Sequence, residues 1–276
     1  MGAVHLTVAD LDRSLRFYED AVGLRTHERS GDRAVLGTGG EYLLVLTELP
    51  GAPPARGYCG LFHFALLVPE RAGLAGWLAH AARDQVPLDG LSDHFVSEAI
   101  YLSDPDEHGI EIYWDRPREL WEGQVDRRLT TLPLDTDSLL SELADPRREP
   151  FEGLAEGTLM GHVHFRVADV APTVDFYTGT LGLDLMARLG TQAAFLSSGG
   201  YHHHVGANTW QSAGAQAAPP DVAGLRHATM LLPDAVAVEA LAARVQDGGQ
   251  APEPLADGGV LVRDPSGNAL ALLVGT

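Results

Sequence analysis

One glutamate in this sequence needs a chemical partner. Glu111 lies between Ile110 and Ile112 in the run GIEIYW, whose pattern predicts a β-strand. Side chains alternate across a strand, so Glu111 and Tyr113 share one face and the two isoleucines occupy the other. A carboxylate buried without a partner costs several kcal/mol. Glu111 must therefore face solvent, form a salt bridge or bind a metal ion.

Histidine is the second residue type here that suggests chemistry. The chain contains 12 histidines, and histidine is both the commonest metal ligand and the usual acid–base group near neutral pH. Three of them, His202, His203 and His204, are consecutive in the run GGYHHHVGANTW, which we expect to form a strand. Alternation then places His202 and His204 on one face and His203 on the other. Which face points toward a site stays open at this point.

The element that must position Glu111 is a predicted β-hairpin over residues 93–117. Two runs typical of strands, FVSEAIYL and GIEIYW, flank the turn-forming segment DPDEHG at 104–109. Glu111 lies in the second strand of this hairpin, so its neighbours across the hairpin come from the first.

An internal duplication organises the rest of the chain. Residues 2–24, GAVHLTVADLDRSLRFYEDAVGL, recur at 161–183 as GHVHFRVADVAPTVDFYTGTLGL. Each copy predicts a strand, an aspartate N-cap and an amphipathic helix that ends at a glycine. His5 and His164 occupy the same position in the two copies.

Two more diverged units follow the same plan, with strands predicted at 61–68 and 225–232 and helices at 74–83 and 236–246. Aligning their hairpin turns places Asp104-Pro105 on Asp264-Pro265. The chain is thus predicted to contain four βαβββ modules, at residues 2–50, 61–115, 161–210 and 224–275, with an acidic linker at 116–158 that includes some helix around 138–144.

Composition excludes several classes of protein. A formal charge of −19 and a pI of about 4.8 argue against nucleic-acid binding, which needs clustered Lys and Arg. No run is long and apolar enough to span a bilayer, and the chain opens directly into a patterned strand, so we expect neither a membrane segment nor a signal peptide. Cys59 is the single cysteine, which excludes an intrachain disulfide and fits the cytoplasm.

The module pattern resembles the vicinal oxygen chelate superfamily, the group of glyoxalases, bleomycin-resistance proteins and extradiol dioxygenases. Within it, the combination of DHFVSEAIYLSDP, GIEIYWDRP, GHVHFRVAD and GGYHHHVGANTW is similar to catechol 2,3-dioxygenases of the bacterial catechol dioxygenase E type. This resemblance covers nearly the whole chain. It implies an α+β fold in which the four βαβββ modules pair into two open β-barrels with flanking helices.

The expected domains are a first pair of modules at 1–115, the linker at 116–158 and a second pair at 159–276. The metal-site barrel is expected from modules 61–115 and 161–210. In this superfamily the metal ligands come from the first and last strands of each module, and modules two and three together supply His63, Glu111 and His162.

The equivalent positions in modules one and four are Ala3, His227 and Ala271, so we expect no metal there. A set of two histidines and one carboxylate leaves three coordination positions open and suits non-haem Fe(II), although Mn, Ni, Co and Zn remain alternatives.

The resemblance also implies three residues on the substrate side of the metal. By the likeness of HHV to the family's pattern, His203 is the first candidate for the acid–base histidine, ahead of His204. Tyr101 resembles the tyrosine that hydrogen-bonds the catecholate oxygen, and His94 resembles a second substrate-side histidine, although its spacing to Tyr101 is shorter than in better-known members. His5 and His164 occur in both copies, including the copy without other ligands, and are interpreted as structural.

The expected function is that of a cytoplasmic oxidoreductase of aromatic catabolism, a metal-dependent extradiol dioxygenase that acts on a small aromatic diol and O₂. A glyoxalase-like isomerase or lyase and a metal-free drug-binding resistance protein are the alternatives. No nucleic-acid or membrane partner is expected, and the oligomeric state, a homo-oligomer included, stays open.

Overall fold

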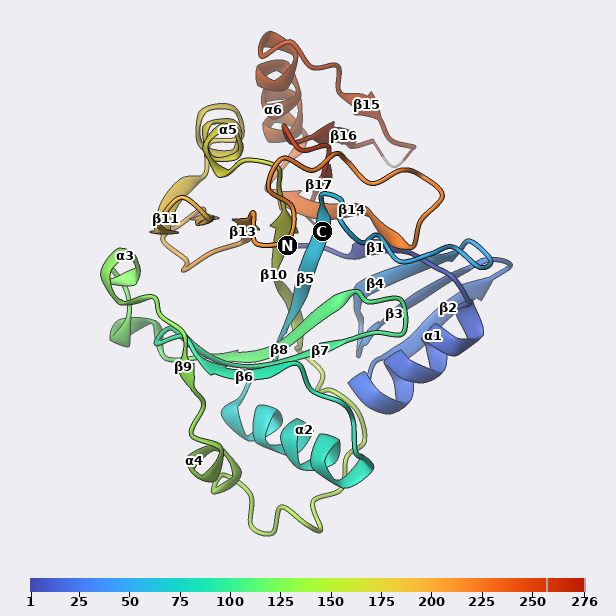
Figure 1. The fold of residues 1–276 in the computed structure, drawn as a ribbon, viewed down its shortest axis with the longest axis vertical. Helices are drawn as coiled ribbons and strands as arrows, with labels where there is room; N and C mark the ends of the chain where they lie inside the picture. The colour runs from blue at the N-terminus through green and yellow to red at the C-terminus, as the bar shows by residue number, and fades with distance from the viewer. Residues whose placement is uncertain (257, 276) are drawn as a thin grey trace.

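The strands of this chain form two sheets, as the computed structural model shows for residues 1–256 and 258–275 (Figure 1). Each sheet combines one module from the N-terminal half of the chain with one from the C-terminal half. The first sheet runs in the order β15 (Glu253–Pro254), β16 (Val260–Arg263), β17 (Ala269–Val274), β14 (Gly224–Leu232), β1 (Val4–Val8), β4 (Glu41–Glu48), β3 (Arg33–Thr38) and β2 (Arg25–Ser30). The second runs β11 (Asp184–Leu189), β12 (Ala193–Ser197), β13 (Val205–Asn208), β10 (Leu159–Arg166), β5 (Gly60–Leu67), β8 (Gly109–Asp115), β7 (Ser97–Ser103), β6 (Gly90–Asp93) and β9 (Leu132–Pro133).

The helices follow the first strand of each module. Asp10 and Asp169 cap two of them as predicted, because each aspartate side chain accepts a hydrogen bond from a backbone N–H in the first turn. Gly23 ends the first helix in the left-handed conformation, with φ of 89°. The module helices are α1 (Leu11–Phe17), α2 (Arg71–Asp84), α5 (Val170–Asp175) and α6 (Ala235–Asp247), with π-helical turns at Tyr18–Val22 and Phe176–Thr180; the linker holds a 3₁₀ turn (Arg118–Leu120), α3 (Val125–Arg128) and α4 (Thr136–Leu140).

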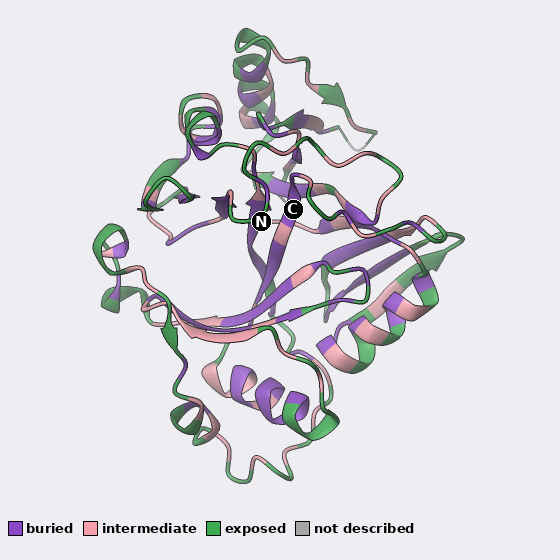
Figure 2. Cartoon of the chain, viewed as in Figure 1, coloured by how far each residue is buried: buried purple, intermediate pink, exposed green. Residues whose placement is uncertain are grey.

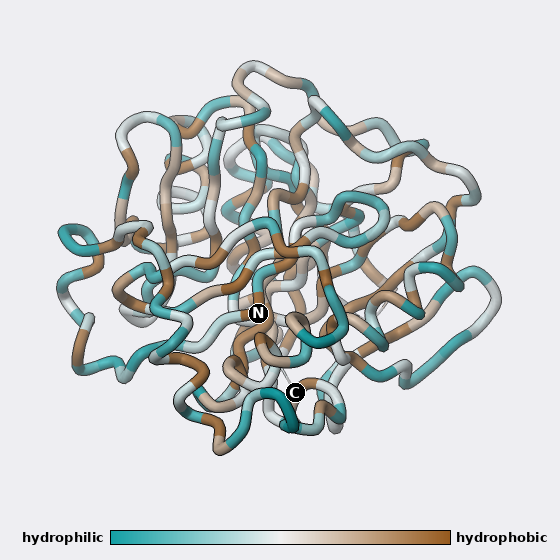
Figure 3. The backbone as a smooth tube through the Cα atoms, turned by 60° about the horizontal axis from the view of Figure 1, so that its bottom comes forward, coloured by the Kyte–Doolittle hydropathy of each residue, from teal (hydrophilic) through white to brown (hydrophobic). Residues whose placement is uncertain are grey.

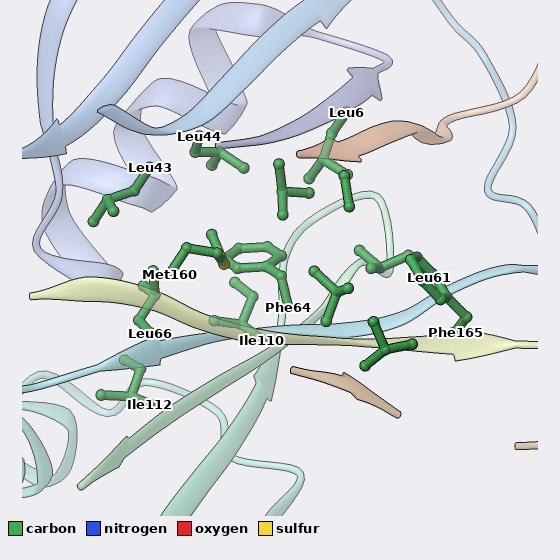
Figure 4. Packing of buried hydrophobic residues seen from close by; sticks show 14 of the residues in the cluster. Leu6, Leu43, Leu44, Leu61, Phe64, Leu66, Ile110, Ile112, Met160 and Phe165 are labelled. Atoms are coloured by element: carbon green, nitrogen blue, oxygen red, sulfur yellow. The ribbon is translucent and has the colours of Figure 1, made fainter. Parts of the chain in front are cut away.

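A continuous hydrophobic core joins the two sheets. Leu6 and Leu44 of the first sheet belong to the same buried cluster as Phe64, Ile110 and Phe165 of the second (Figure 4). Burial is concentrated in the central strands and along one side of the helices (Figure 2), and many of the outer turns of the chain are hydrophilic (Figure 3). The core therefore takes one face of the central strands, which leaves their opposite face available for a site.

Asp104, in the predicted hairpin turn, links the second sheet to the helical segment that follows β1. Asp104 accepts hydrogen bonds from the backbone N–H groups of Asp106 and His108 and so closes the turn. The same carboxylate accepts a bond of 2.8 Å from the hydroxyl of Tyr18, which follows α1 in the other half of the fold. Asp264 closes the corresponding turn of the fourth module in the same way, through the N–H groups of Ser266 and Asn268.

The fold class is as the repeats and the resemblance predicted, with two curled sheets and flanking helices. One strand prediction is wrong. In GGYHHHVGANTW only Val205–Asn208 forms a strand, and the three histidines precede it in an irregular segment. Alternation therefore does not govern their directions. No helix among the described residues has the length and apolar character needed to cross a membrane.

The two sheets place a histidine pair at the same central position. His164 lies opposite His63 where β10 pairs with β5, and His5 lies opposite His227 where β1 pairs with β14. In the first sheet the two rings stack, with centroids 3.9 Å apart. Burial, together with the nearby His227, Arg33 and Arg226, lowers the pKa of His5 to about 3.

This depressed pKa predicts an acid sensitivity that belongs to the first sheet. Below pH 6.5 the unfolded chain protonates His5 while the folded chain keeps it neutral down to about pH 3, so stability is lost as pH falls through that window. His5→Phe keeps a stacked ring without a titrating group. On acidification the free energy of unfolding should therefore fall less in the variant than in the parent chain. The difference is at most about 1.4 kcal/mol per pH unit, the value for one titrating group. Urea unfolding at pH 7 and pH 4.5 measures this, and parallel losses in the two proteins would contradict it.

Candidate metal centre

Three neighbouring strands bring the predicted ligands to one point. β5 lies between β10 and β8 in the second sheet, and these strands carry His63, His162 and Glu111 respectively. The alternation read from the sequence holds here: Ile110 and Ile112 enter the hydrophobic core, whereas Glu111 points away from it. All three ligand candidates are buried, with Glu111 only 2% exposed.

The three donor atoms are close enough to share one ion. The Oε2 atom of Glu111 lies 3.0 Å from Nε2 of His63 and 3.1 Å from Nε2 of His162, and the two nitrogens are 3.4 Å apart. Donors that bind one ion at about 2.1 Å and at right angles to each other lie about 3.0 Å apart. The arrangement thus fits one face of an octahedron, and it leaves the three positions of the opposite face for other ligands.

The charges of the three side chains also fit a cation. Burial alone would raise the pKa of Glu111, but His162 and His63 outweigh it and hold that pKa well below its usual range. Burial lowers the pKa of His162, against the opposing effect of Glu111. The site therefore presents an anionic carboxylate with a neutral imidazole at neutral pH, which is the protonation state in which these groups bind metal ions.

A cavity of about 1040 Å³ opens beside these donors. His63 and Glu111 contribute to its wall, and the linker contributes Leu129, Thr130 and Thr131. A volume of this order accommodates a small organic molecule. The linker is thus part of the site and is more than a connection between modules.

Tyr101 and His94 form a hydrogen-bonded pair in the wall of this cavity. Tyr101 lies directly opposite Glu111 where β7 pairs with β8, and its hydroxyl is 2.7 Å from Nε2 of His94. The Nδ1 atom of His94 lies 2.7 Å from the carbonyl oxygen of Thr130, so Nδ1 carries the proton and Nε2 accepts the bond from Tyr101. Burial and the charge of Glu111 raise the pKa of Tyr101 well above its ordinary value, which keeps the hydroxyl protonated.

His203 lines the cavity and its ring lies against His162, with centroids 4.1 Å apart. Its Nδ1 atom is 2.8 Å from Nδ1 of His202, and Nε2 of His202 is 2.8 Å from the carboxylate of Asp115. The carboxylate accepts from Nε2–H of His202, so Nδ1 of His202 accepts from Nδ1–H of His203. This series of hydrogen bonds leaves Nε2 of His203 without a proton. Burial, and to a smaller extent the neighbouring histidines, also lower the pKa of His203 well below its ordinary value.

The third histidine of the run is directed elsewhere. Nδ1 of His204 lies 2.9 Å from the hydroxyl of Ser197, and His204 is absent from the residues that line the cavity. Of the two candidates from the sequence, His203 is the one that the fold places beside the metal-site donors.

Several residues of the site were missed by the sequence reasoning. His164, interpreted there as structural, lines the cavity with its ring 5.0 Å from that of His63. Its position two residues after His162 on the same strand is a period-two signal that would have found it. The same period from Glu111 through Tyr113 leads to Asp115, which holds His202. Thr130 carries no such signal, because the linker has no regular structure there.

Comparison with known proteins was consistent with this geometry. The family model described as the Glyoxalase/Bleomycin resistance protein/Dioxygenase superfamily matches residues 1–112 and 159–272. A curated relative named catechol-2,3-dioxygenase, from Bacillus subtilis (strain 168), is 38% identical over 282 residues, which cover 99% of this chain and 96% of the relative.

Two solved structures share the fold at low sequence identity. Glyoxalase I from Zea mays superimposes with a TM-score of 0.61 and 16% identity, over 99% of this chain and 91% of that one. The cppA protein from Streptococcus pneumoniae TIGR4 has a TM-score of 0.59 and 14% identity, over 99% and 97%. At these identities the likeness concerns the fold alone.

Proposed function

The chain belongs to the glyoxalase/bleomycin resistance protein/dioxygenase superfamily, and from that premise we propose that it is a metal-dependent extradiol dioxygenase that cleaves the ring of a catechol-type substrate with O₂. The observation that carries the proposal is the set of three mutually adjacent donors, His63, Glu111 and His162, beside a cavity of about 1040 Å³. The full-length relative named catechol-2,3-dioxygenase supports it.

His63, Glu111 and His162 are the residues that would hold the metal. Fe(II) is the ion we propose, because two histidines and one carboxylate with open positions are typical of non-haem Fe(II) oxygenases. When bound, the ion would act as a Lewis acid that lowers the pKa of a diol hydroxyl, and it would bring the diol and O₂ together on its open face. Mn, Ni, Co and Zn are the alternatives that metal analysis distinguishes.

His203 supplies the proton acceptor in this proposal. Its ring lines the cavity, and Nε2 is the nitrogen left without a proton because Nδ1–H is committed to His202. A neutral imidazole in this position takes a proton from a substrate hydroxyl and returns it later in the reaction, which is general acid–base catalysis. Asp115 and His202 are positioning residues, because they fix which nitrogen of His203 carries the proton.

Tyr101 and His94 hold the substrate in the same proposal. The Tyr101 hydroxyl stays protonated, and His94 fixes its orientation through a bond of 2.7 Å. With its O–H donated to His94, the Tyr101 oxygen can accept a hydrogen bond from a diol hydroxyl without the entropy loss of first becoming ordered. The surrounding buried residues limit the access of water to the diol.

Oxygen consumption tests the function. Protein purified without oxygen, loaded with Fe(II) and mixed with catechol should consume O₂ and form a yellow muconic semialdehyde in equal amounts. A glyoxalase-like isomerase would consume no O₂, and a drug-binding protein would retain no stoichiometric metal after the same purification. Either result, with a panel of substituted catechols, would overturn the proposal.

Replacing Asp115 tests the hydrogen-bonded series Asp115–His202–His203, which we call the proton chain. Asp115→Asn allows the amide nitrogen to donate to Nε2 of His202, which moves a proton to Nδ1 of His202 and so onto Nε2 of His203. That tautomer of His203 cannot accept a proton from the substrate. We expect kcat to fall about 10-fold or more with metal content unchanged, and the fall to be smaller than for loss of His203 itself. An unchanged kcat and pH profile would show that Asp115 does not act through His203.

A further inference from the structure

Among the described residues, one arginine of the cavity wall has no carboxylate partner. Arg166 ends strand β10, and it lies on the same side of that strand as His162 and His164, which are four and two residues earlier. At about 3.3 Å per residue, its backbone is about 13 Å from that of His162. The arginine therefore stands at the far end of the cavity from the metal-site donors.

The hydrogen bonds of Arg166 do not neutralise its charge. Its Nη2 atom donates to the carbonyl oxygen of Ala55 at 3.1 Å, and its buried Nε has no hydrogen-bond partner among the described residues. The nearby carboxylate of Glu107 is already bound by Arg56, through Nε at 2.7 Å and through Nη2. Within the described part of the chain, no carboxylate oxygen lies within ion-pair distance of Arg166.

Arg166 remains a cation in this setting. Burial lowers its pKa from the ordinary value, but a guanidinium stays protonated in proteins. Arg56 and Glu107 neutralise each other, and Asp89 of the cavity wall accepts a hydrogen bond from Ser103, so the charge of Arg166 has no direct ion-pair partner among the described residues. A partly buried charge without a counter-ion is unfavourable, so a ligand that supplies the counter-ion gains affinity.

The wall between the donors and Arg166 is aromatic. Phe62 and Trp210 contact each other at 5.4 Å between centroids, and His164 lies against both, at 5.3 and 5.8 Å. All three rings line the cavity. A flat, largely apolar ring packs favourably against such a surface.

We propose that Arg166 binds an anionic substituent of the substrate, so that the preferred substrate is a carboxylated catechol, with its two hydroxyls toward His63, Glu111 and His162 and its carboxylate on the guanidinium. This inference rests on the proposed function for the identity of the diol end, whereas the anion site rests on Arg166 alone. Guanidinium and carboxylate form two parallel hydrogen bonds, which a lysine cannot reproduce.

Paired substrates measure the contribution of the anion. The Fe(II)-loaded protein is assayed with 3,4-dihydroxyphenylacetate and with its uncharged methylamide. We expect kcat/KM to favour the carboxylate by at least about 10-fold. Arg166→Met should lower kcat/KM for the carboxylate by on the order of 10²-fold, mainly through KM, and bring the ratio of the two substrates close to one. Arg166→Lys should give an intermediate ratio, and Arg226→Met, at an exposed position of the other sheet, should keep the parental ratio.

Binding without turnover separates this inference from the proposed function. Calorimetric titration of the metal-free protein with the same two compounds should show tighter binding of the carboxylate, and Arg166→Met should remove the difference. That result supports the anion site even if no catechol is cleaved. If Arg166→Met lost the same affinity for both compounds, the arginine would have a purely structural role and the inference would be overturned. Tighter binding of the methylamide than of the carboxylate by the parental protein would overturn it as well.

Discussion

Glu111→Ala is expected to empty the metal site and abolish turnover. The change removes the only anionic donor of the three and leaves His63 and His162 with their Nε2 atoms 3.4 Å apart. Two neutral imidazoles hold a divalent ion far more weakly than two imidazoles and a carboxylate, and without the carboxylate the three-donor face is lost. Mass spectrometry after anaerobic purification should find about one metal ion per parental chain and only background metal in the variant.

The other sheet provides a matched control for this experiment. His227 occupies the position in β14 that His63 occupies in β5, but it stacks on His5, and Ala271 stands where Glu111 would be. His227→Ala should therefore retain the metal. If His227→Ala lost the ion and Glu111→Ala kept it, the assignment of the metal centre to the second sheet would be wrong.

His203→Phe is expected to keep the metal and lose the reaction. Phenylalanine preserves a flat ring against His162 but has no nitrogen to accept a proton. The loss of a positioned acid–base group lowers turnover by on the order of 10² to 10⁴. Stopped-flow measurement of O₂ consumption gives the rate, while metal analysis and anaerobic titration with catechol show that both ligands still bind.

A double variant shows whether the proton chain acts as one unit. If Asp115 works only through His203, His203→Phe combined with Asp115→Asn should be no slower than His203→Phe alone. Unchanged turnover in His203→Phe would remove the histidine from the mechanism. His164, which also lines the cavity, would then be the next acid–base candidate to replace.

Periodicity explains which parts of the site the sequence revealed. His63, Glu111 and His162 lie on strands, where alternation and the repeat decide which side chains share a face, and the structure brings the three together as that reasoning expected. Their role as ligands stays a prediction. The same local rule failed at residues 201–204, because contacts with Asp115, 86 and 87 residues away, shape that segment.

Contacts of this kind leave no pattern in the sequence. Thr130 orients His94 from the linker, and its position depends on how the edge strand β9 pairs with β6. Arg166 was visible as a charged residue at the end of a strand, where a solvent-exposed position is the usual expectation. Only the three-dimensional arrangement shows that Glu107 is bound by Arg56 and that Arg166 has no carboxylate partner in the described part of the chain.

The strand order also sets a sequence of events during synthesis. Every strand of the second sheet, which carries the candidate metal centre, lies between residues 60 and 208, whereas the first sheet is split between residues 4–48 and 224–274. A nascent chain can therefore complete the second sheet before β14, the antiparallel partner of β1, has left the ribosome. Until then the apolar face with Phe64 and Ile110 lacks half of its cover. Truncation shortly after residue 208 should thus release a chain in which the candidate metal centre is nearly complete and which has a strong tendency to aggregate.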